Sequence, residues 1–218
     1  MTHLPGEYPS KREDGKQRSP SCRQTEGMKL HPPPLPIHWP YAPRPLSGLA
    51  QKGPLEVPGF GSGWWFEGVD EPLDGIPEPL TGAFGRGGVT ALGDRVIRPY
   101  RRGGWLRHVV RTVYATSHRF RDELFVHRAL WGAGFPTVEP LGCAWRRRGL
   151  GVEGLYLTRR TAGQAWPRAW EIPGVMEALE TALRSLVAWG VWSPDLNTTN
   201  VLVQTDGSIV LLDWDRAR

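Results

Sequence analysis

An Asp-Gly pair between two β-rich runs constrains the fold of this chain more than any other sequence feature. The runs cover residues 201–204 and 209–212, and Asp206-Gly207 between them is typical of a β-hairpin with a two-residue turn. Counting outward from such a turn places Asn200 opposite Asp213. Paired cross-strand residues share one face, with Cβ atoms about 5 Å apart. The sequence therefore predicts an amide and a carboxylate side by side at the open end of this hairpin.

Asn200 and Asp213 would supply oxygen atoms of the kind that Mg²⁺ prefers. This ion usually takes one or two carboxylates from a protein and completes its shell with nucleotide phosphates and water. Asp195 precedes Asn200 by five residues, and we expect it to accept the proton of an attacking hydroxyl or to orient that hydroxyl. The pattern favours phosphoryl transfer, with Asp195 as the base and Asn200 and Asp213 as metal ligands.

A simpler interpretation of the same residues is an ordinary surface hairpin, in which Asn200 and Asp213 serve turn formation alone. Asp215 follows Asp213 by two residues and would point the same way along a continuing strand. Asp215 would then either help to hold the metal or be solvated, and we favour the solvated state.

Further upstream, a glycine-rich loop precedes two predicted strands. Residues 82–88 read Gly-Ala-Phe-Gly-Arg-Gly-Gly, and the β-rich runs 89–92 and 95–98 follow with a Gly-Asp turn between them. Glycine lets a backbone approach phosphates closely and expose its N–H groups. An ordinary turn is the alternative in a chain with 27 glycines. The residues that we expect to bind nucleotide phosphates in this loop are Gly85, Arg86, Gly87 and Gly88.

Residues 117–131 have helical spacing, with apolar side chains on one stripe and glycines just after it. Glu123 lies beside or within the stripe that should pack inward, and such a carboxylate rarely stays buried without a cationic partner. One alternative is a solvated Glu123 paired with Arg119, four residues earlier. We expect His127 to pack within the stripe rather than to act as a ligand.

Three segments resemble motifs of the lipopolysaccharide kinase (Kdo/WaaP) family, among the kinase-like phosphotransferases. Members of that family typically carry an RxYRRGG strand end, an HxDLNxxN loop and an IDFDRGR-like segment. This chain has, in the same order, RPYRRGG at 98–104, DLNTTN at 195–200 and LDWDRAR at 212–218. Three motifs in the same order are far more specific than any one of them alone.

The resemblance implies an α+β, bilobal protein-kinase-like fold, with a mostly antiparallel N-lobe sheet and a truncated, mainly helical C-lobe. It implies ATP as the donor, Mg²⁺ as the metal, and a sugar hydroxyl of the lipopolysaccharide inner core, Kdo or heptose, as the acceptor. Arg98 occupies the strand position of the phosphate-holding lysine of most kinases, and Glu123 matches the helix glutamate that pairs with it. We therefore expect Glu123 to orient Arg98 toward the α- and β-phosphates, since a guanidinium binds phosphate oxygens two at a time.

Some positions depart from the family pattern. Ser193 and Pro194 stand where the family usually has a histidine and a small residue. Asn197 replaces the lysine of protein kinases that neutralises the transferring phosphoryl group. Arg86 or the arginine-rich residues 98–121 would have to supply that positive charge instead. The chain stops at Arg218, where family members normally continue, so we expect a short C-lobe with an open hairpin edge. A nucleotide-binding pseudokinase or fragment without turnover is the second interpretation.

Composition divides the chain into three segments. Residues 1–58 are rich in proline with little hydrophobic periodicity and predict a disordered or extended arm. Residues 59–160 would form the N-lobe, with an apolar strand at 154–158 leading to the next lobe. Residues 161–218 would form the C-lobe, in which a helix over 176–189 supports the catalytic loop. The inward residues predicted for this helix are Leu179, Leu183, Leu186 and Val187, with Gly190 as its stop.

The net charge is +5, and residues 98–121 hold seven arginines, two histidines and no acidic residue. Such a basic segment suits anionic lipid headgroups or nucleic acid, or it is a solvated face without a partner. The resemblance favours a lipopolysaccharide precursor glycolipid as substrate. We therefore expect peripheral contact with the anionic inner leaflet and no stable nucleic acid partner. A basic nucleic-acid-binding module is the third interpretation.

Cys22 and Cys143 lie far apart in the sequence, which argues against a disulfide framework and for a reducing compartment. No run approaches the roughly 18 apolar residues of a membrane span, and the N-terminus lacks the pattern of a signal peptide. We therefore expect a cytoplasmic protein. The sequence leaves the oligomeric state open.

Overall fold

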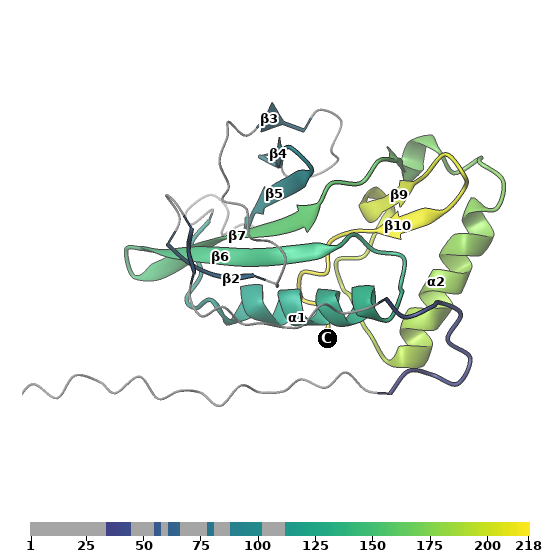
Figure 1. Cartoon of the computed structure of the whole chain (residues 1–218), viewed down its shortest axis with the longest axis horizontal. Coiled ribbons are helices and arrows are strands. Elements are labelled where there is room, and N and C mark those ends of the chain that lie inside the picture. The colour runs from purple at the N-terminus through teal and green to yellow at the C-terminus, as the bar shows by residue number, and fades with distance from the viewer. Residues whose placement is uncertain (1–33, 45–54, 58–60, 66–77, 81–87, 102–111) are drawn as a thin grey trace, which may run out of the picture. The chain divides into compact units, whose positions relative to one another are not determined.

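The computed structural model describes residues 34–44, 55–57, 61–65, 78–80, 88–101 and 112–218 (Figure 1). Most of the glycine-rich loop, including Gly85, Arg86 and Gly87, lies outside these ranges, as does the middle of the basic segment. The predicted phosphate-binding role of these three residues therefore stays a prediction.

An antiparallel seven-stranded sheet, in the order β1-β2-β6-β7-β5-β4-β3, forms the larger part of the described fold (Figure 1). The long strands β6 and β7 lie near its middle, and β7 also pairs with β5. Together with two α-helices this sheet confirms the predicted α+β class. The strands are β1 (Leu55–Val57), β2 (Gly61–Trp65), β3 (Glu78–Pro79), β4 (Thr90–Leu92), β5 (Arg95–Pro99), β6 (Pro140–Arg148) and β7 (Gly151–Arg159).

The β4–β5 hairpin is the one predicted from the Gly-Asp turn. Gly93 has a φ of +57°, a left-handed conformation that glycine adopts without a Cβ penalty. Across the turn Leu92 pairs with Arg95 and Thr90 pairs with Ile97. Because side chains alternate between the two faces of a strand, this register also sets the face of the sheet on which the next residue, Arg98, lies.

The helix α1 (His118–Gly132) matches the predicted helix to within one residue and packs against β6 and β7. Phe120 and Leu124 are buried on its inner face, as the stripe predicted. A Cβ at Gly154 of β7 would lie 2.5 Å from the Phe120 ring, so only glycine permits this close approach of helix and sheet.

The helix α2 (Val175–Trp189) ends at Gly190, which has a φ of +74° and stops the helix as predicted. The predicted inner face is only partly right. Leu186 is buried, whereas Leu183 and Val187 are 40% and 79% exposed. The buried stripe is rotated toward Ala182, Ser185, Leu186 and Trp189, because the large Trp189 ring occupies the interior.

The C-terminal hairpin has a different register from the predicted one. Strands β9 (Val201–Val203) and β10 (Ile209–Leu211) pair Val203 with Ile209, and β8 (Gln164–Ala165) flanks β9. The loop comprises residues 205–207 instead of two residues, and Gly207 takes the left-handed position with a φ of +82°. The N–H of Leu212 donates to the carbonyl oxygen of Asn200 at 2.8 Å. Asn200 therefore lies opposite Leu212, and the predicted Asn200–Asp213 pair is wrong by one residue.

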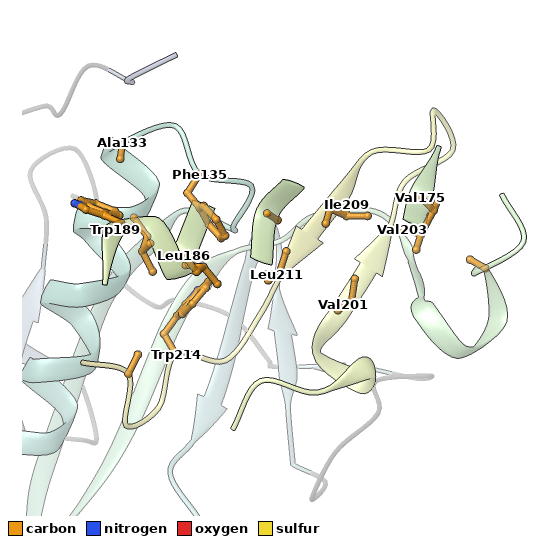
Figure 2. Packing of buried hydrophobic residues seen from close by; sticks show 14 residues of the cluster. Ala133, Phe135, Val175, Leu186, Trp189, Val201, Val203, Ile209, Leu211 and Trp214 are labelled. Carbon is orange, nitrogen blue, oxygen red and sulfur yellow. The ribbon is translucent and has the colours of Figure 1, made fainter. Parts of the chain in front are cut away.

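Buried side chains form two clusters among the described residues. The smaller one joins Tyr100, Phe120 and Tyr156 between α1 and the seven-stranded sheet. The larger one lies around α2 and the C-terminal hairpin and includes Phe135, Trp189 and Trp214 (Figure 2). Trp214 is fully buried although it follows the last strand of the chain.

A short segment of the proline-rich region, residues 34–44, contacts the C-terminal end of α1. Trp39 donates from its indole Nε1 to the carbonyl oxygen of Ala133 at 2.6 Å. Arg44 donates to the carbonyl oxygens of Trp131 and Phe135 at 2.9 and 3.1 Å. These carbonyls lie at the C-terminal end of α1, where backbone acceptors lack helical partners. We call residues 34–44 the strap.

Residues 32–218 form one compact unit, and the predicted division into two lobes at residue 160 stays a prediction. Cys143 is buried. Among the residues that the structure describes, neither helix is long and apolar enough to cross a membrane.

Candidate nucleotide and metal site

Arg98 of β5 joins two acidic residues from different parts of the fold. Its Nη2 donates to Oε1 of Glu123 on α1, and its Nη1 donates to Oδ1 of Asp213 at 2.9 Å. The guanidinium carbon also lies 5.4 Å from the ring centres of Tyr100 and Tyr156. The two acids hold the pKa of Arg98 above its ordinary value, although burial acts in the opposite direction. Arg98 therefore stays charged at the junction of sheet, helix and C-terminal segment.

Glu123 is buried, with only 2% of the residue exposed, and both of its carboxylate oxygens are hydrogen-bonded. Arg98 donates to Oε1, and the hydroxyl of Tyr100 donates to Oε2 at 2.5 Å. Burial raises the pKa of Glu123 above its ordinary value, and the positive charge of Arg98 acts in the opposite direction and favours the carboxylate. Burial also raises the pKa of Tyr100, so this hydroxyl keeps its proton and remains a donor. The predicted ion pair between Glu123 and Arg98 is therefore present.

The alternative partner of Glu123, Arg119, is bound to another residue. Its Nε and Nη2 donate to the two carboxylate oxygens of Asp215, with 2.7 Å between Nε and Oδ1. The Asp215 side chain is only 13% exposed, so the predicted solvated state is wrong. This bidentate pair ties α1 to the segment that carries Asp213.

Asp213 reaches Arg98 through an unusual backbone conformation. It follows β10 and has a φ of +63°, which is uncommon for any residue except glycine. The backbone therefore leaves the strand geometry at this point. Asn200 lies across from Leu212, one position before Asp213, because its carbonyl oxygen accepts from the N–H of Leu212. The hairpin thus brings Asn200 and Asp213 to the same end, although not as a direct cross-strand pair.

Asp195 and Asn200 belong to a half-exposed loop that is organised by short-range hydrogen bonds. Asn200 donates from Nδ2 to the carbonyl oxygen of Asp195 at 3.0 Å, and Asn197 donates to the same oxygen at 2.9 Å. Asn197 also accepts from the N–H of Thr199 and so caps the short 3-10 helix η3 (Thr198–Asn200). Because the amide nitrogen of Asn200 is used in this way, its oxygen Oδ1 is the atom suited to a metal.

Gly88 is the one member of the predicted phosphate loop that the structure describes. It has a φ of +85°, and a Cβ at this position would come within 2.3 Å of Nη2 of Arg101. The positive φ favours glycine here, whereas the contact involves the end of the flexible Arg101 side chain, which can move. The two observations show a tight backbone next to an arginine, and the contact with phosphate stays a prediction.

Two further contributors were not predicted from the sequence. Tyr100 lies two residues after Arg98, and residues at this spacing share one face of a strand, so a period-two reading of β5 would have found it. Thr137 lies in the turn between α1 and β6 and contacts the C-terminal segment by side chain and backbone. No local pattern marks Thr137, because its partners are distant in the sequence.

The residues present fit a nucleotide with a hard metal ion. Within the described ranges, no group of three or more His, Cys, Asp or Glu residues can hold a metal. An ion bound by Asp213 and Asn200 would therefore need phosphate and water oxygens to complete its shell, as Mg²⁺ does beside nucleotides. The two hydrogen bonds of Arg98 use two of its five N–H donors, so others remain for phosphate oxygens.

Residues 70–218 match the lipopolysaccharide kinase (Kdo/WaaP) family. The match spans more than half of the chain and includes Arg98, Glu123, Asp195, Asn200 and Asp213. The chain therefore belongs to this family.

Curated relatives include two proteins named 3-deoxy-D-manno-octulosonic acid kinase. The Xylella fastidiosa (strain M12) protein is 27% identical over 175 residues, covering 72% of this chain and 64% of the relative. The Xanthomonas campestris pv. campestris (strain B100) protein is 30% identical over 152 residues, covering 61% of this chain and 58% of the relative. The chain thus spans less than two thirds of the length of either relative.

Among solved structures, the chain is similar to the bifunctional kinase-methyltransferase WbdD. One WbdD structure has a TM-score of 0.42 and 20% identity over 60% of this chain and 29% of WbdD. A second, at higher resolution, has a TM-score of 0.43 and 16% identity over 60% of this chain and 30% of WbdD.

Proposed function

We propose that this protein transfers the γ-phosphoryl group of ATP to a sugar hydroxyl of the lipopolysaccharide inner core, on Kdo or heptose. The observation that carries the proposal is the position of Arg98 between Glu123 and Asp213. One cation there joins a buried helix glutamate and a candidate metal ligand, and kinase sites likewise place a glutamate-paired cation and a metal-binding aspartate beside the triphosphate.

Each part of the site has a distinct role in this proposal. Glu123 and Tyr100 fix the guanidinium of Arg98, whose remaining N–H groups bind the α- and β-phosphates. Asp213 and Asn200 are suited to hold Mg²⁺, which when bound would offset the negative charge of the phosphates. The loop at Gly88 would cover the phosphates on the side away from Asp213 and Asn200.

Asp195 is the proposed base. Two amide side chains, those of Asn197 and Asn200, hold the backbone carbonyl of Asp195. Its carboxylate would accept the proton of the acceptor hydroxyl or orient that hydroxyl for attack. Positioning supplies most of the rate enhancement in phosphoryl transfer, so the placement of this carboxylate is its main contribution.

The names of the curated relatives support a Kdo-bearing acceptor. A glycolipid acceptor would bring the protein to the anionic inner leaflet of the membrane. The nucleic-acid alternative loses support, because Arg98 and Arg119 of the basic segment are used in internal ion pairs. A pseudokinase remains a separate outcome that only turnover decides.

The test is a transfer assay with γ-labelled ATP and Mg²⁺ on two matched acceptors, a lipid A precursor bearing Kdo and the same precursor without Kdo. The expected result is label on the Kdo-bearing glycolipid, none on the Kdo-free one, and none when Mg²⁺ is chelated. Nucleotide binding without transfer to any core-sugar acceptor would contradict the kinase proposal and support the pseudokinase.

A further inference from the structure

The backbone around Asp213 is held in part by residues outside the proposed catalytic set. Its positive φ is a conformation that persists only where the surrounding structure holds it in place. Arg98 binds its carboxylate, but that contact does not fix the backbone on either side. Leu212 donates to the carbonyl oxygen of Asn200, and Asp215 is bound by Arg119. Further contacts hold Leu211, two residues before Asp213, and Trp214, directly after it.

One hydroxyl group binds both of these neighbours. The Thr137 hydroxyl donates to the carbonyl oxygen of Leu211 at 2.8 Å and accepts from the indole Nε1 of Trp214 at 2.8 Å. The N–H of Leu211 donates to the carbonyl oxygen of Pro136, also at 2.8 Å. Asp213 therefore lies in the sequence between two residues that are fixed to the same side chain.

His127 completes the hydrogen bonding of Thr137. Its Nε2 lies 2.9 Å from the Thr137 hydroxyl, and its Nδ1 lies 2.8 Å from the hydroxyl of Tyr156. One arrangement of protons satisfies all these groups: Tyr156 donates to Nδ1, and a neutral His127 donates from Nε2 to Thr137. Burial lowers the pKa of His127 to about 3, which keeps the ring neutral.

The hydroxyl of Thr137 is thus fully used, with one bond donated and two accepted. All of its partners are buried, so none has water as a substitute. Trp214 also packs against Phe135 in the larger hydrophobic cluster, which leaves the indole little freedom (Figure 2).

From this geometry we propose that Thr137 is a positioning residue, which sets the backbone of residues 211–214 so that Asp213 faces Arg98 and the nucleotide metal. The inference deepens the proposed function and rests on it for the role of Asp213. Thr137 itself touches neither substrate nor metal in this scheme. His127 acts behind Thr137 by fixing its hydroxyl.

The test compares Thr137→Val, which keeps the shape and removes the hydroxyl, with Thr137→Ser, which keeps the hydroxyl. Ser185→Ala is the matched control, because Ser185 is a buried hydroxyl of α2 that bonds the carbonyl oxygen of Thr181 in its own helix. The first readout is amide hydrogen exchange over residues 211–218. Thr137→Val should exchange faster there, whereas Thr137→Ser and Ser185→Ala should match the unmodified protein.

The second readout is calorimetric affinity for ATP with and without Mg²⁺. We expect Thr137→Val to lose at least about tenfold of the Mg²⁺-dependent affinity, and Thr137→Ser to lose less than about threefold, since each tenfold is 1.4 kcal/mol. Absence of Mg²⁺-dependent binding in the unmodified protein would contradict the proposed function, while the exchange measurement would still decide the role of Thr137.

Unchanged exchange over 211–218 in Thr137→Val would overturn the inference. If this variant does not fold, Trp214→Phe replaces it, because it keeps an aromatic ring and removes the indole donor together with part of the ring volume. The same local increase in exchange is expected for Trp214→Phe, and its absence would likewise overturn the inference.

Discussion

The site has two sides that are held differently. The phosphate side lies around Arg98 and Glu123, and the loop side lies around Asp195 and Asn200. Glu123 is almost fully buried and is bonded to residues that lie far away in the sequence. Asp195 and Asn200 are half exposed, and the bond between them joins residues five positions apart. The phosphate side should therefore govern stability and nucleotide affinity, whereas the loop side should govern the chemical step.

The largest expected effect is on the loop side. Asp195→Asn removes the proposed base while keeping the shape of the loop, so turnover should fall by about 100-fold or more. Affinity for Mg·ATP should change by less than about threefold, since Asp195 does not bind the metal in this proposal. Steady-state transfer kinetics and calorimetry on the same sample separate the two. Turnover that is unchanged in Asp195→Asn would dismiss Asp195 as the base.

The phosphate side is tested by Arg98→Met, which leaves Glu123 without its cation. Removing one partner of a buried ion pair costs about 3 kcal/mol or more. Urea unfolding without nucleotide should show this loss, and ATP affinity should fall as well. Arg119→Met is the control, because the Asp215 side chain that it leaves behind is 13% exposed whereas that of Glu123 is 1% exposed, so its loss should cost less. Equal losses for the two variants would contradict the greater cost of leaving the more deeply buried Glu123 without a cation.

His127 gives the stability of the folded protein a specific pH dependence. Its pKa is lowered by burial from 6.5 to about 3, so between these pH values the unfolded chain binds a proton that the folded protein does not. Stability should therefore fall with decreasing pH by up to about 1.4 kcal/mol per unit in that window, in addition to the effect of the carboxylates. His127→Gln should lack this extra slope. Parallel stability curves for the two proteins from pH 7 to 4 would contradict it.

The smallest effect concerns the hairpin loop. Gly207→Ala should cost about 1 kcal/mol or somewhat more, since φ is +82° and a Cβ would lie 2.8 Å from the carbonyl oxygen of Pro173. Gly149→Ala has a similar φ with open space around it and should cost less. Thermal unfolding of the two variants measures the difference. A Gly207→Ala variant no less stable than Gly149→Ala would contradict the described loop.

Local patterns predicted much of the phosphate side. The β4–β5 hairpin follows from a glycine turn, α1 from its apolar spacing, and the burial of Glu123 from its place on the helix stripe. The cation that pairs with Glu123 was identified through the family motif, since no local rule selects Arg98 over Arg119. The structure then shows Arg119 bound to Asp215 instead.

The hairpin register could not be predicted from its turn residues alone. An Asp-Gly pair suits both a two-residue loop and a three-residue loop with glycine at its last position. A shift of one residue changes every cross-strand pair, so Asn200 lies opposite Leu212 rather than Asp213. The approach of Asp213 to the site depends on its own backbone conformation and on Thr137, which are tertiary features.

The strap shows how a short part of the proline-rich region packs against the fold. Proline-rich sequence usually lacks enough apolar area to pack, but Trp39 and Tyr41 lie against Phe135 within the larger cluster. Two aromatic rings are enough to hold a short segment of extended chain. The rotated face of α2 has a similar cause, because contact with Trp39 adds to the burial of Trp189.

The most direct measurement of the central claim is calorimetric titration of ATP, with and without Mg²⁺, into the unmodified protein and into Asp213→Ala. The expected result is tight binding that requires Mg²⁺ in the unmodified protein and a large loss of that Mg²⁺-dependent part in Asp213→Ala. ATP affinity that is the same with and without Mg²⁺, or that is unaffected by Asp213→Ala, would contradict a metal–nucleotide site at Arg98, Glu123 and Asp213.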